Sequence, residues 1–201
     1  MDKLIIIGAG GHGRVVKDIA LSLNKYKEIS FLDDFAVGTS VVGKVEDFSN
    51  YIGDSEFIVA IGNNDIRQKI SNLIIDGGAK LTSLIHSNAV IGGEVNIGDG
   101  SVVMAGVVIN NGAKIGQGVI VNTCSSIDHD CVVKNYSHVS VGARIAGTVS
   151  IDEKVFVGAG ATIINNVSVV SKTIIGAGAV VVKDIVKCGT YVGVPAKIVK
   201  A

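Results

Sequence analysis

The sequence predicts a small parallel α/β domain followed by a parallel β-helix. Ile or Val occupies every sixth position from Ile85 to Val181, whereas the residues before this stretch alternate apolar runs with loops and helical segments. Helices and strands have side-chain periods of about 3.6 and 2, so neither explains a period of six. A chain that turns a corner every six residues and stacks its coils does explain it. In this pattern Ile151 points inward and Lys154 lies at an outward corner.

The N-terminal region begins as a Rossmann-like unit. An apolar strand at 4–7 leads into the glycine loop Gly8-Ala9-Gly10-Gly11-His12-Gly13, which is followed by a helix at 14–23. A second strand at 29–31 ends at the pair Asp33-Asp34. Strands that alternate with helices in this way are typical of a parallel sheet.

The rest of this region continues the alternation. We expect a short helical segment at 46–51, a third strand at 57–61 and a last strand at 80–85 that runs into the β-helix. The helix between the last two strands begins near Asn63, a residue type that caps helices, and has an apolar stripe of Ile66, Ile70 and Leu73. We therefore expect one domain at 1–82 and a second at 83–201, packed rigidly together.

Composition narrows the possible functions. The chain has 18 basic and 18 acidic residues and a net charge of zero, which argues against nucleic acid or a membrane surface as a partner. Its three cysteines, Cys124, Cys131 and Cys188, form no CxxC pair and fit a reducing cytoplasm. The opening apolar run is too short for a secretory or membrane-spanning segment.

The glycine loop indicates an anion site. Gly8, Gly10 and Gly13 satisfy GxGxxG, but NAD needs two mononucleotide halves and this region supplies only one. His12 also lies where a pyrophosphate would approach the helix. Amides at a helix N-terminus bind anions, so we expect a nucleotide or nucleotide sugar; a purely structural turn is the alternative. The pair at 33–34 could accept hydrogen bonds from sugar hydroxyls or a base, or be a solvated turn.

Six motifs in order give the chain a family resemblance. They are Gly-Ala-Gly-Gly-His-Gly, Phe31-Leu32-Asp33-Asp34-Phe35, Ala60-Ile61-Gly62-Asn63-Asn64-Asp65-Ile66-Arg67, Asn122-Thr123 with His129-Asp130-Cys131, His138-Val139-Ser140-Val141-Gly142-Ala143, and Gly193-Val194-Pro195-Ala196-Lys197. Together they resemble the hexapeptide-repeat sugar O/N-acyltransferases, and most closely the UDP-4-amino-sugar N-acetyltransferases of bacillosamine synthesis. The resemblance implies a left-handed β-helix, an exception to the usual right-handed crossover. It also implies acetyl-CoA as co-substrate and a homotrimer with active sites between subunits.

The resemblance assigns a base. His129 matches the family's catalytic histidine, and histidine is the usual base near neutral pH. Asp130 follows where a well-known enzyme of the family has Glu and would hold the ring, with Asp128 as a second candidate. Asn122 matches an asparagine near the base. Without the family, the histidine could be a solvated corner residue and the asparagine a structural one.

Ligand contacts follow from the same resemblance. His138 matches a residue that contacts acetyl-CoA, and Gly147, Ala159 and Ala177 match positions that line the CoA channel. The residues that match nucleotide-sugar contacts are Gly10, Gly11, His12, Asp33, Asp34 and Gly62. His86 matches a histidine at the domain junction and receives no role.

Two other kinds of site are conceivable, a cysteine nucleophile and a zinc ion bound by histidines. Cys131 lies near His129 and could suggest a thiol nucleophile, but it occupies the inward compact position of the repeat. Zinc held by histidines also occurs in such β-helices, but His129 and His138 fall in different phases of the repeat. We therefore expect a core cysteine and no metal.

The expected function is acetyl-CoA-dependent N-acetylation of the 4-amino group of a UDP-linked 4-amino-4,6-dideoxy sugar. His129 would act as base in a direct attack, without an acyl-enzyme. The alternatives are an O-acetyltransferase acting on sialic acid or a related sugar, and a trimeric scaffold that only binds nucleotide sugars.

Overall fold

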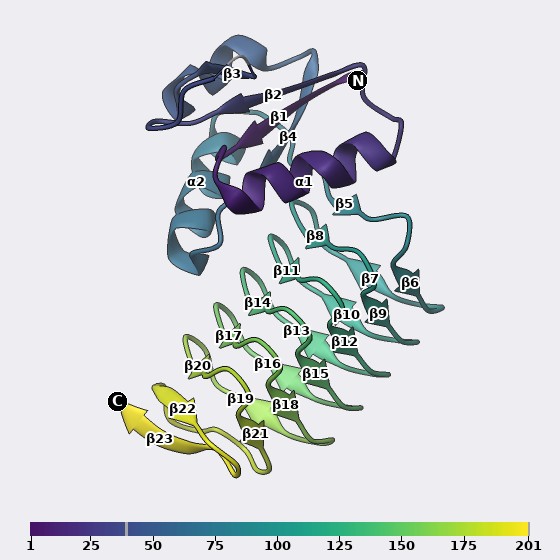
Figure 1. The fold of residues 1–201 in the computed structure, drawn as a ribbon, viewed down its shortest axis with the longest axis vertical. Helices are drawn as coiled ribbons and strands as arrows, with labels where there is room; N and C mark the ends of the chain where they lie inside the picture. The colour runs from purple at the N-terminus through teal and green to yellow at the C-terminus, as the bar shows by residue number, and fades with distance from the viewer. Residues whose placement is uncertain (39, 201) are drawn as a thin grey trace.

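The computed structural model describes residues 1–38 and 40–200 and confirms the fold class, a parallel α/β region followed by a left-handed β-helix (Figure 1). The N-terminal sheet has the order β3-β2-β1-β4 and all its pairs are parallel. Its strands are β1 Lys3–Ile7, β2 Glu28–Leu32, β3 Val41–Gly43 and β4 Ser55–Val59. The helices are α1 Gly11–Ser22, the 3-10 helix η1 Val45–Tyr51 and α2 Asn64–Asp76.

Strand β1 is apolar because both faces of the sheet are covered, as is usual for parallel sheets. Leu4 and Ile6 belong to the core shared with α1 and the first coils of the β-helix. Ile5 and Ile7 point the other way, into a second core that includes Ile74 of α2. The strand thus contributes to two cores.

Several N-terminal boundaries differ from the sequence expectation. Helix α1 begins at Gly11 rather than at residue 14, β4 ends at Val59, and β3 was not expected. The last expected strand is reduced to a bridge between Leu81 and Phe57, after which the chain enters the β-helix at Leu84.

The three faces of the β-helix are rows of two-residue strands. Face 1 consists of β5 Leu84–Ile85, β8 Val102–Val103, β11 Ile120–Val121, β14 His138–Val139, β17 Phe156–Val157 and β20 Ile174–Ile175, extended by β22 Thr190–Val192 and β23 Lys197–Lys200. Face 2 consists of β6 Val90–Ile91, β9 Val108–Ile109, β12 Ser126–Ile127, β15 Arg144–Ile145, β18 Thr162–Ile163 and β21 Val180–Val181. Face 3 consists of β7 Asn96–Ile97, β10 Lys114–Ile115, β13 Val132–Val133, β16 Ser150–Ile151 and β19 Ser168–Val169.

The six-residue repeat forms the core of this prism. Ile115, Val133 and Ile151 pair in register on face 3, and all three are buried. In the first coil the ladder is less covered on face 2, where Ile91 is 36% exposed. We call the three corners edge 1/2, edge 2/3 and edge 3/1, after the faces that they join. Edge 2/3 is therefore opposite face 1.

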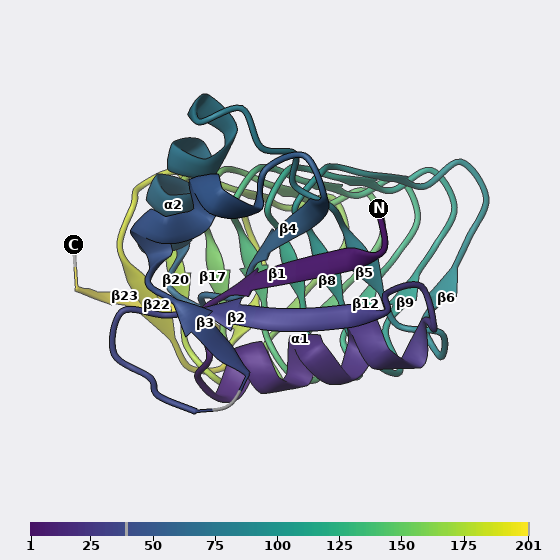
Figure 2. The ribbon, with the colours of Figure 1, turned by 90° about the horizontal axis from the view of Figure 1, so that it is seen from above.

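The N-terminal region covers the beginning of the β-helix and one of its edges. Helix α1 lies across the first coils (Figures 1 and 2), and its Val16, Ile19 and Ala20 share one core with them. Helix α2 packs against edge 3/1, where Arg67 and Asn64 bond to carbonyls of successive coils. Among the described residues, no helix is long and apolar enough to cross a membrane.

The buried face of α2 differs from the expected stripe. Ile66 and Leu73 are exposed, whereas Arg67, Ser71 and Ile74 are buried. The inward face of α2 contacts backbone carbonyls of edge 3/1. Arg67 therefore occupies a buried position at which the sequence pattern favours an apolar residue. Hydrophobic periodicity alone could not find this face.

Candidate functional site

The six residues expected to contact the nucleotide sugar lie on three neighbouring loops. Parallel strands place their carboxyl ends at the same edge of a sheet, where α/β proteins bind ligands. Gly10, Gly11 and His12 follow β1, the 33–34 pair follows β2, and Gly62 follows β4. Backbone hydrogen bonds tie the loops together, since Gly8 donates to the Leu32 carbonyl at 2.9 Å and Ala60 donates to Ile7 at 2.8 Å.

The glycines of the first loop have different tasks. A side chain on Gly13 would lie 1.9 Å from the Gly8 carbonyl oxygen, so Gly13 allows α1 to pack on the strand. Gly10 is the N-cap of α1, has extended backbone angles and makes no side-chain cap bond. A Cβ there would meet nothing within 4 Å. The start of α1 is therefore open to a ligand, and its amides favour an anion.

Asp33 braces these loops. Its Oδ2 accepts the Ala9 amide at 2.7 Å, and its Oδ1 accepts the amides of Phe35 and Ala36 at 2.8 and 2.7 Å. Burial raises the pKa of this carboxyl, but the three amides outweigh burial and lower the pKa. Asp34 accepts the Val45 amide at 2.9 Å and is otherwise exposed. The sequence suggested ligand contacts for both; the structure adds a structural role for Asp33.

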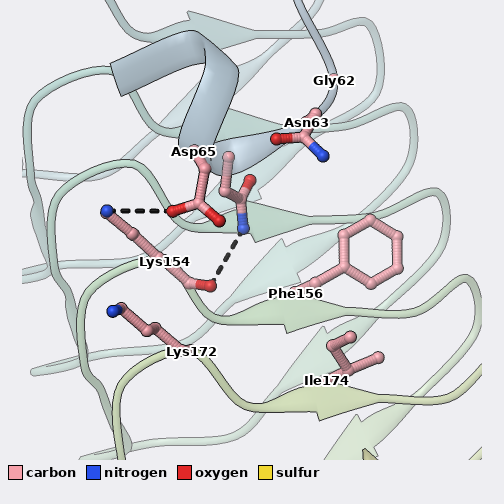
Figure 3. Close-up of a pocket in the computed structure, with 8 residues that line it drawn as sticks. Gly62, Asn63, Asp65, Lys154, Phe156, Lys172 and Ile174 are labelled. Atoms are coloured by element: carbon pink, nitrogen blue, oxygen red, sulfur yellow. Dashed lines mark hydrogen bonds and ion pairs between the residues drawn. The ribbon is translucent and has the colours of Figure 1, made fainter. Parts of the chain in front are cut away.

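A hollow of about 410 Å³ opens beside Gly62 (Figure 3). Lys154 lines it and binds Asp65 through Nζ and Oδ1 at 2.9 Å, while its carbonyl accepts Asn64 Nδ2 at 3.1 Å. Lys154 lies at a corner of the β-helix, as expected, but α2 covers this corner, so its side chain is only 18% exposed. The complete lining is Gly62, Asn63, Asn64, Asp65, Lys154, Phe156, Lys172 and Ile174.

His138 lies at the domain junction. Its side chain is buried on β14, edge-on to Phe156 with ring centroids 5.1 Å apart. Burial, and to a smaller extent the charge of Arg67, lowers its pKa to about 4. Its Nε2 is 3.1 Å from Asn122 Nδ2. Asn122 was expected near the base, but within one chain it contacts His138 instead.

His129 occupies edge 2/3 and is exposed. Its Nδ1 is 2.9 Å from Asp130 Oδ2, so that ring nitrogen is assigned the proton and Nε2 the lone pair. The hydrogen bond to Asp130, together with the nearby carboxylate charges, raises the pKa of His129. Asp128 instead accepts the His129 backbone amide at 2.7 Å and Asn110 Nδ2 at 2.8 Å. Of the two carboxylates, Asp130 therefore orients the ring.

Gly147 lies directly under that ring. A Cβ at this position would be 2.6 Å from His129 Nε2, so only glycine leaves the ring its place. Gly147 thus shares edge 2/3 with His129. Ala159 and Ala177, which were expected to line the same channel, lie on edge 1/2 together with Asn122.

The other candidates have local roles. Cys131 is buried, its Sγ contacts the Ala146 carbonyl at 3.1 Å, and burial raises the pKa of its thiol. It is a core residue rather than an activated nucleophile. His86 Nδ1 accepts the Asn88 amide at 3.0 Å within a turn. In the described part of the chain, no three His, Cys, Asp or Glu side chains are grouped as metal ligands would be.

One chain does not bring all the expected residues together. The Gly62 loop and the 410 Å³ hollow lie on face 1 and edge 3/1. His129, Asp130 and Gly147 lie on edge 2/3, across the prism. Sequence reasoning also missed Arg67, Phe156 and Lys172, which lie at the junction and became visible only once α2 was placed against the β-helix.

Comparisons with known proteins identify relatives of this chain. A family model described as the PglD N-terminal domain matches residues 3–74. The chain is 32% identical over 113 residues to the UDP-N-acetylbacillosamine N-acetyltransferase of Bacillus subtilis (strain 168), and the match spans 52% of each protein. The chain therefore matches about half the length of that curated relative.

Two solved structures match over nearly their whole length. One is the acetyltransferase domain of PglB from Neisseria gonorrhoeae FA1090, with a TM-score of 0.97, 41% identity and coverage of 99% of this chain and 100% of that one; it has also been solved with acetyl coenzyme A. The other is a mutant of perosamine N-acetyltransferase from Caulobacter crescentus in complex with CoA and GDP-perosamine, with a TM-score of 0.94, 37% identity and coverage of 98% of this chain and 96% of that one. The chain belongs to this family of hexapeptide-repeat sugar N-acetyltransferases.

Proposed function

We propose that the protein transfers the acetyl group of acetyl-CoA to the 4-amino group of a UDP-linked 4-amino-4,6-dideoxy sugar. The observation that carries this proposal is the His129–Asp130 pair, a base with an oriented ring, on a chain whose N-terminal loops are shaped for a nucleotide. The relatives with related activities support it. Because one relative was solved with GDP-perosamine, a GDP-linked amino sugar is the second candidate.

The nucleotide sugar would lie along the carboxyl edge of the sheet. The diphosphate suits the open N-terminus of α1 at Gly10 and Gly11, where amides and the helix dipole favour negative charge. The sugar would then reach the hollow beside Gly62. There Phe156 and Ile174 offer an apolar wall to a 6-deoxy carbon, and Lys172 adds a positive charge.

Acetyl-CoA would lie along edge 1/2. Gly142, Gly160 and Gly178 stack there with φ of 63°, 65° and 67°, and a Cβ on any of them would meet nothing within 4 Å. Together with the exposed Ala159 and Ala177 they leave a column of bare backbone. The column fits an extended pantetheine arm, which needs close approach rather than large side chains.

The reaction itself needs a base and a good leaving group. The sugar amine attacks the thioester carbonyl, a C–N bond forms, and the C–S bond breaks to release CoA as thiolate. His129 Nε2 takes the proton of the attacking amine and returns it to the sulfur, while Asp130 stabilises the charged ring.

We propose that the base comes from another copy of the chain. His129 lies on the edge opposite face 1, so it cannot reach the hollow of its own chain. A neighbour whose edge 2/3 meets this chain's edge 1/2 would complete the site, which supports the expected homotrimer. The reducing cytoplasm suggested by the free cysteines suits this reaction.

The proposal is tested by thiol release from acetyl-CoA in the presence of UDP-, GDP-, CMP- or dTDP-linked amino sugars. We expect turnover with a UDP-linked 4-amino sugar, and a loss of about 10²–10⁴-fold in kcat for His129→Ala. His86→Ala is the matched control, because the His86 side chain accepts the Asn88 amide of its own turn and its backbone bonds do not depend on the ring. A His129→Ala enzyme within about threefold of the unmodified protein would refute the assigned base.

A further inference from the structure

Arg67 carries a buried charge whose six acceptors are all neutral. The side chain is 1% exposed, and Nε donates to the Gly118 carbonyl at 2.7 Å. One terminal nitrogen donates to the carbonyls of Ile61 and Gly62 at 3.0 and 3.1 Å. The other donates to Asn64 Oδ1, Tyr136 O and Ser137 O at 2.8, 2.7 and 3.2 Å. Burying a charge without an opposite charge is costly, so these bonds need a reason beyond packing.

The acceptors belong to two parts of the molecule, and the proposed reaction requires these parts to keep a fixed relative position. Ile61 and Gly62 form the loop between β4 and α2, which borders the 410 Å³ hollow. Gly118 and Tyr136 lie on successive coils at edge 3/1. Arg67 therefore joins this loop to edge 3/1 of the β-helix, through hydrogen bonds that the charge of the guanidinium strengthens.

Two histidines of the expected site meet beside this guanidinium. His12 and His138 each have a buried ring nitrogen without a hydrogen-bond partner among the described residues, Nε2 and Nδ1 respectively. Burial and then the charge of Arg67 lower the pKa of both to about 4. Burial lowers the pKa of Arg67 itself only to about 10, so near neutral pH the cluster is one cation beside two neutral rings.

We propose that Arg67 is a positioning residue for the nucleotide-sugar half of the acetyl-transfer site: it locks the Gly62 loop onto edge 3/1 and so sets the shape of the hollow. The proposal rests on the proposed function. It predicts that a change at Arg67 affects the two substrates differently. A misplaced loop weakens the binding of the nucleotide sugar, whereas the exposed backbone of edge 1/2 still binds acetyl-CoA.

The test compares Arg67→Lys with Ile74→Val. Lysine keeps the charge but cannot make the bidentate and forked bonds of a guanidinium. Ile74 lies on the same helix, is fully buried and faces the other core, so Ile74→Val destabilises α2 while the side chain of Arg67 and its acceptors remain in place. We expect Arg67→Lys to raise the KM for the UDP-linked amino sugar on the order of tenfold, with the KM for acetyl-CoA within about twofold. Ile74→Val should lower the melting temperature and leave both KM values unchanged.

A second measurement does not depend on turnover. In Arg67→Met the buried charge is gone, so NMR titration should show the pKa of His12 and His138 rising from about 4. If Arg67→Met does not fold, the titration is not possible, and the comparison of KM values between Arg67→Lys and Ile74→Val decides the proposal. An unchanged KM in Arg67→Lys, or an equal rise in Ile74→Val, overturns the positioning role. No turnover by the unmodified protein would instead refute the proposed function and leave the titration standing.

Discussion

At the scale of single residues, the site depends on how each side chain is already engaged. Asp130 is free to hold the His129 ring because Asp128 binds the backbone of the same corner. Asp130 has a φ of 58°, a conformation that Asp tolerates better than most residues. The shorter Asp therefore reaches Nδ1 where related enzymes are expected to use Glu.

This contact predicts a pH effect for Asp130→Asn. A base works in its neutral form, so kcat/KM rises as the pH rises through the pKa of His129. Asp130 raises that pKa by stabilising the charged ring, so Asn should move the rising limb to lower pH, toward the ordinary value of 6.5. The maximal rate should fall at least about tenfold, because the tautomer is no longer fixed. pH profiles of kcat/KM measure both effects.

The control for this change is Asp130→Glu, which keeps the charge and introduces the residue that the resemblance implies at this position. It should retain both the profile and most of the rate. A limb that stays in place in Asp130→Asn would mean that another group controls the ionisation of His129.

The sequence could predict the role of a residue only where that role depends on local pattern rather than on contacts between distant segments. Cys131 was predicted correctly as core, because its place in the repeat fixes its direction. The three amides on Asp33 could not be foreseen, because they come from the folded geometry of two loops. The bonds of Arg67 to Gly118 and Tyr136 span 51 and 69 residues, and no local pattern reports such contacts.

At the scale of elements, regular repeats were the most predictable part. Each two-residue strand of the β-helix has an inward aliphatic residue, so the period alone locates it. Boundaries at the N-terminal sheet were less predictable, since hydrogen bonds rather than apolar runs end β4 at Val59. Helix α2 shows the limit of periodicity, because a buried arginine and serine form its inward face.

Helix α1 provides the element-scale prediction. Asp is a preferred N-cap, and a side chain at Gly10 has open space, so Gly10→Asp should keep or raise stability. The same carboxylate would occupy the expected diphosphate position and repel it. We expect the KM for the nucleotide sugar to rise on the order of tenfold, with little change in the KM for acetyl-CoA.

Gly10→Asn separates charge from bulk, because it has nearly the same shape and also caps helices. It should disturb binding much less than Gly10→Asp. Calorimetry with UDP measures the comparison directly. Equal affinities for UDP in both variants would place the diphosphate elsewhere.

At the scale of the whole molecule, the expected base and the expected sugar site lie on opposite sides of the β-helix. The Gly62 loop and its hollow border face 1, and the His129–Asp130 pair lies on the opposite edge. The six-residue period fixes which residues share an edge, so the sequence alone separates His129 from the residues of face 1. How α2 and the N-terminal sheet sit against face 1 is not, since it depends on contacts between distant segments.

The separation leads to a test by complementation. His129→Ala removes the base, and Gly10→Asp weakens nucleotide-sugar binding on the order of tenfold. At nucleotide-sugar concentrations below the KM, each variant alone should therefore be folded and lose about tenfold or more of the rate. If each site takes its base from one chain and its loops from another, trimers from an equal mixture of co-expressed chains combine both intact halves at roughly a quarter of their sites. Thiol release should therefore recover to about that fraction of the unmodified rate. Mixing the purified variants without subunit exchange is the control and should recover nothing. If co-expressed chains also show no recovery while light scattering shows mixed trimers, both halves belong to the same chain, and the base assigned to a neighbour would have to be sought on face 1.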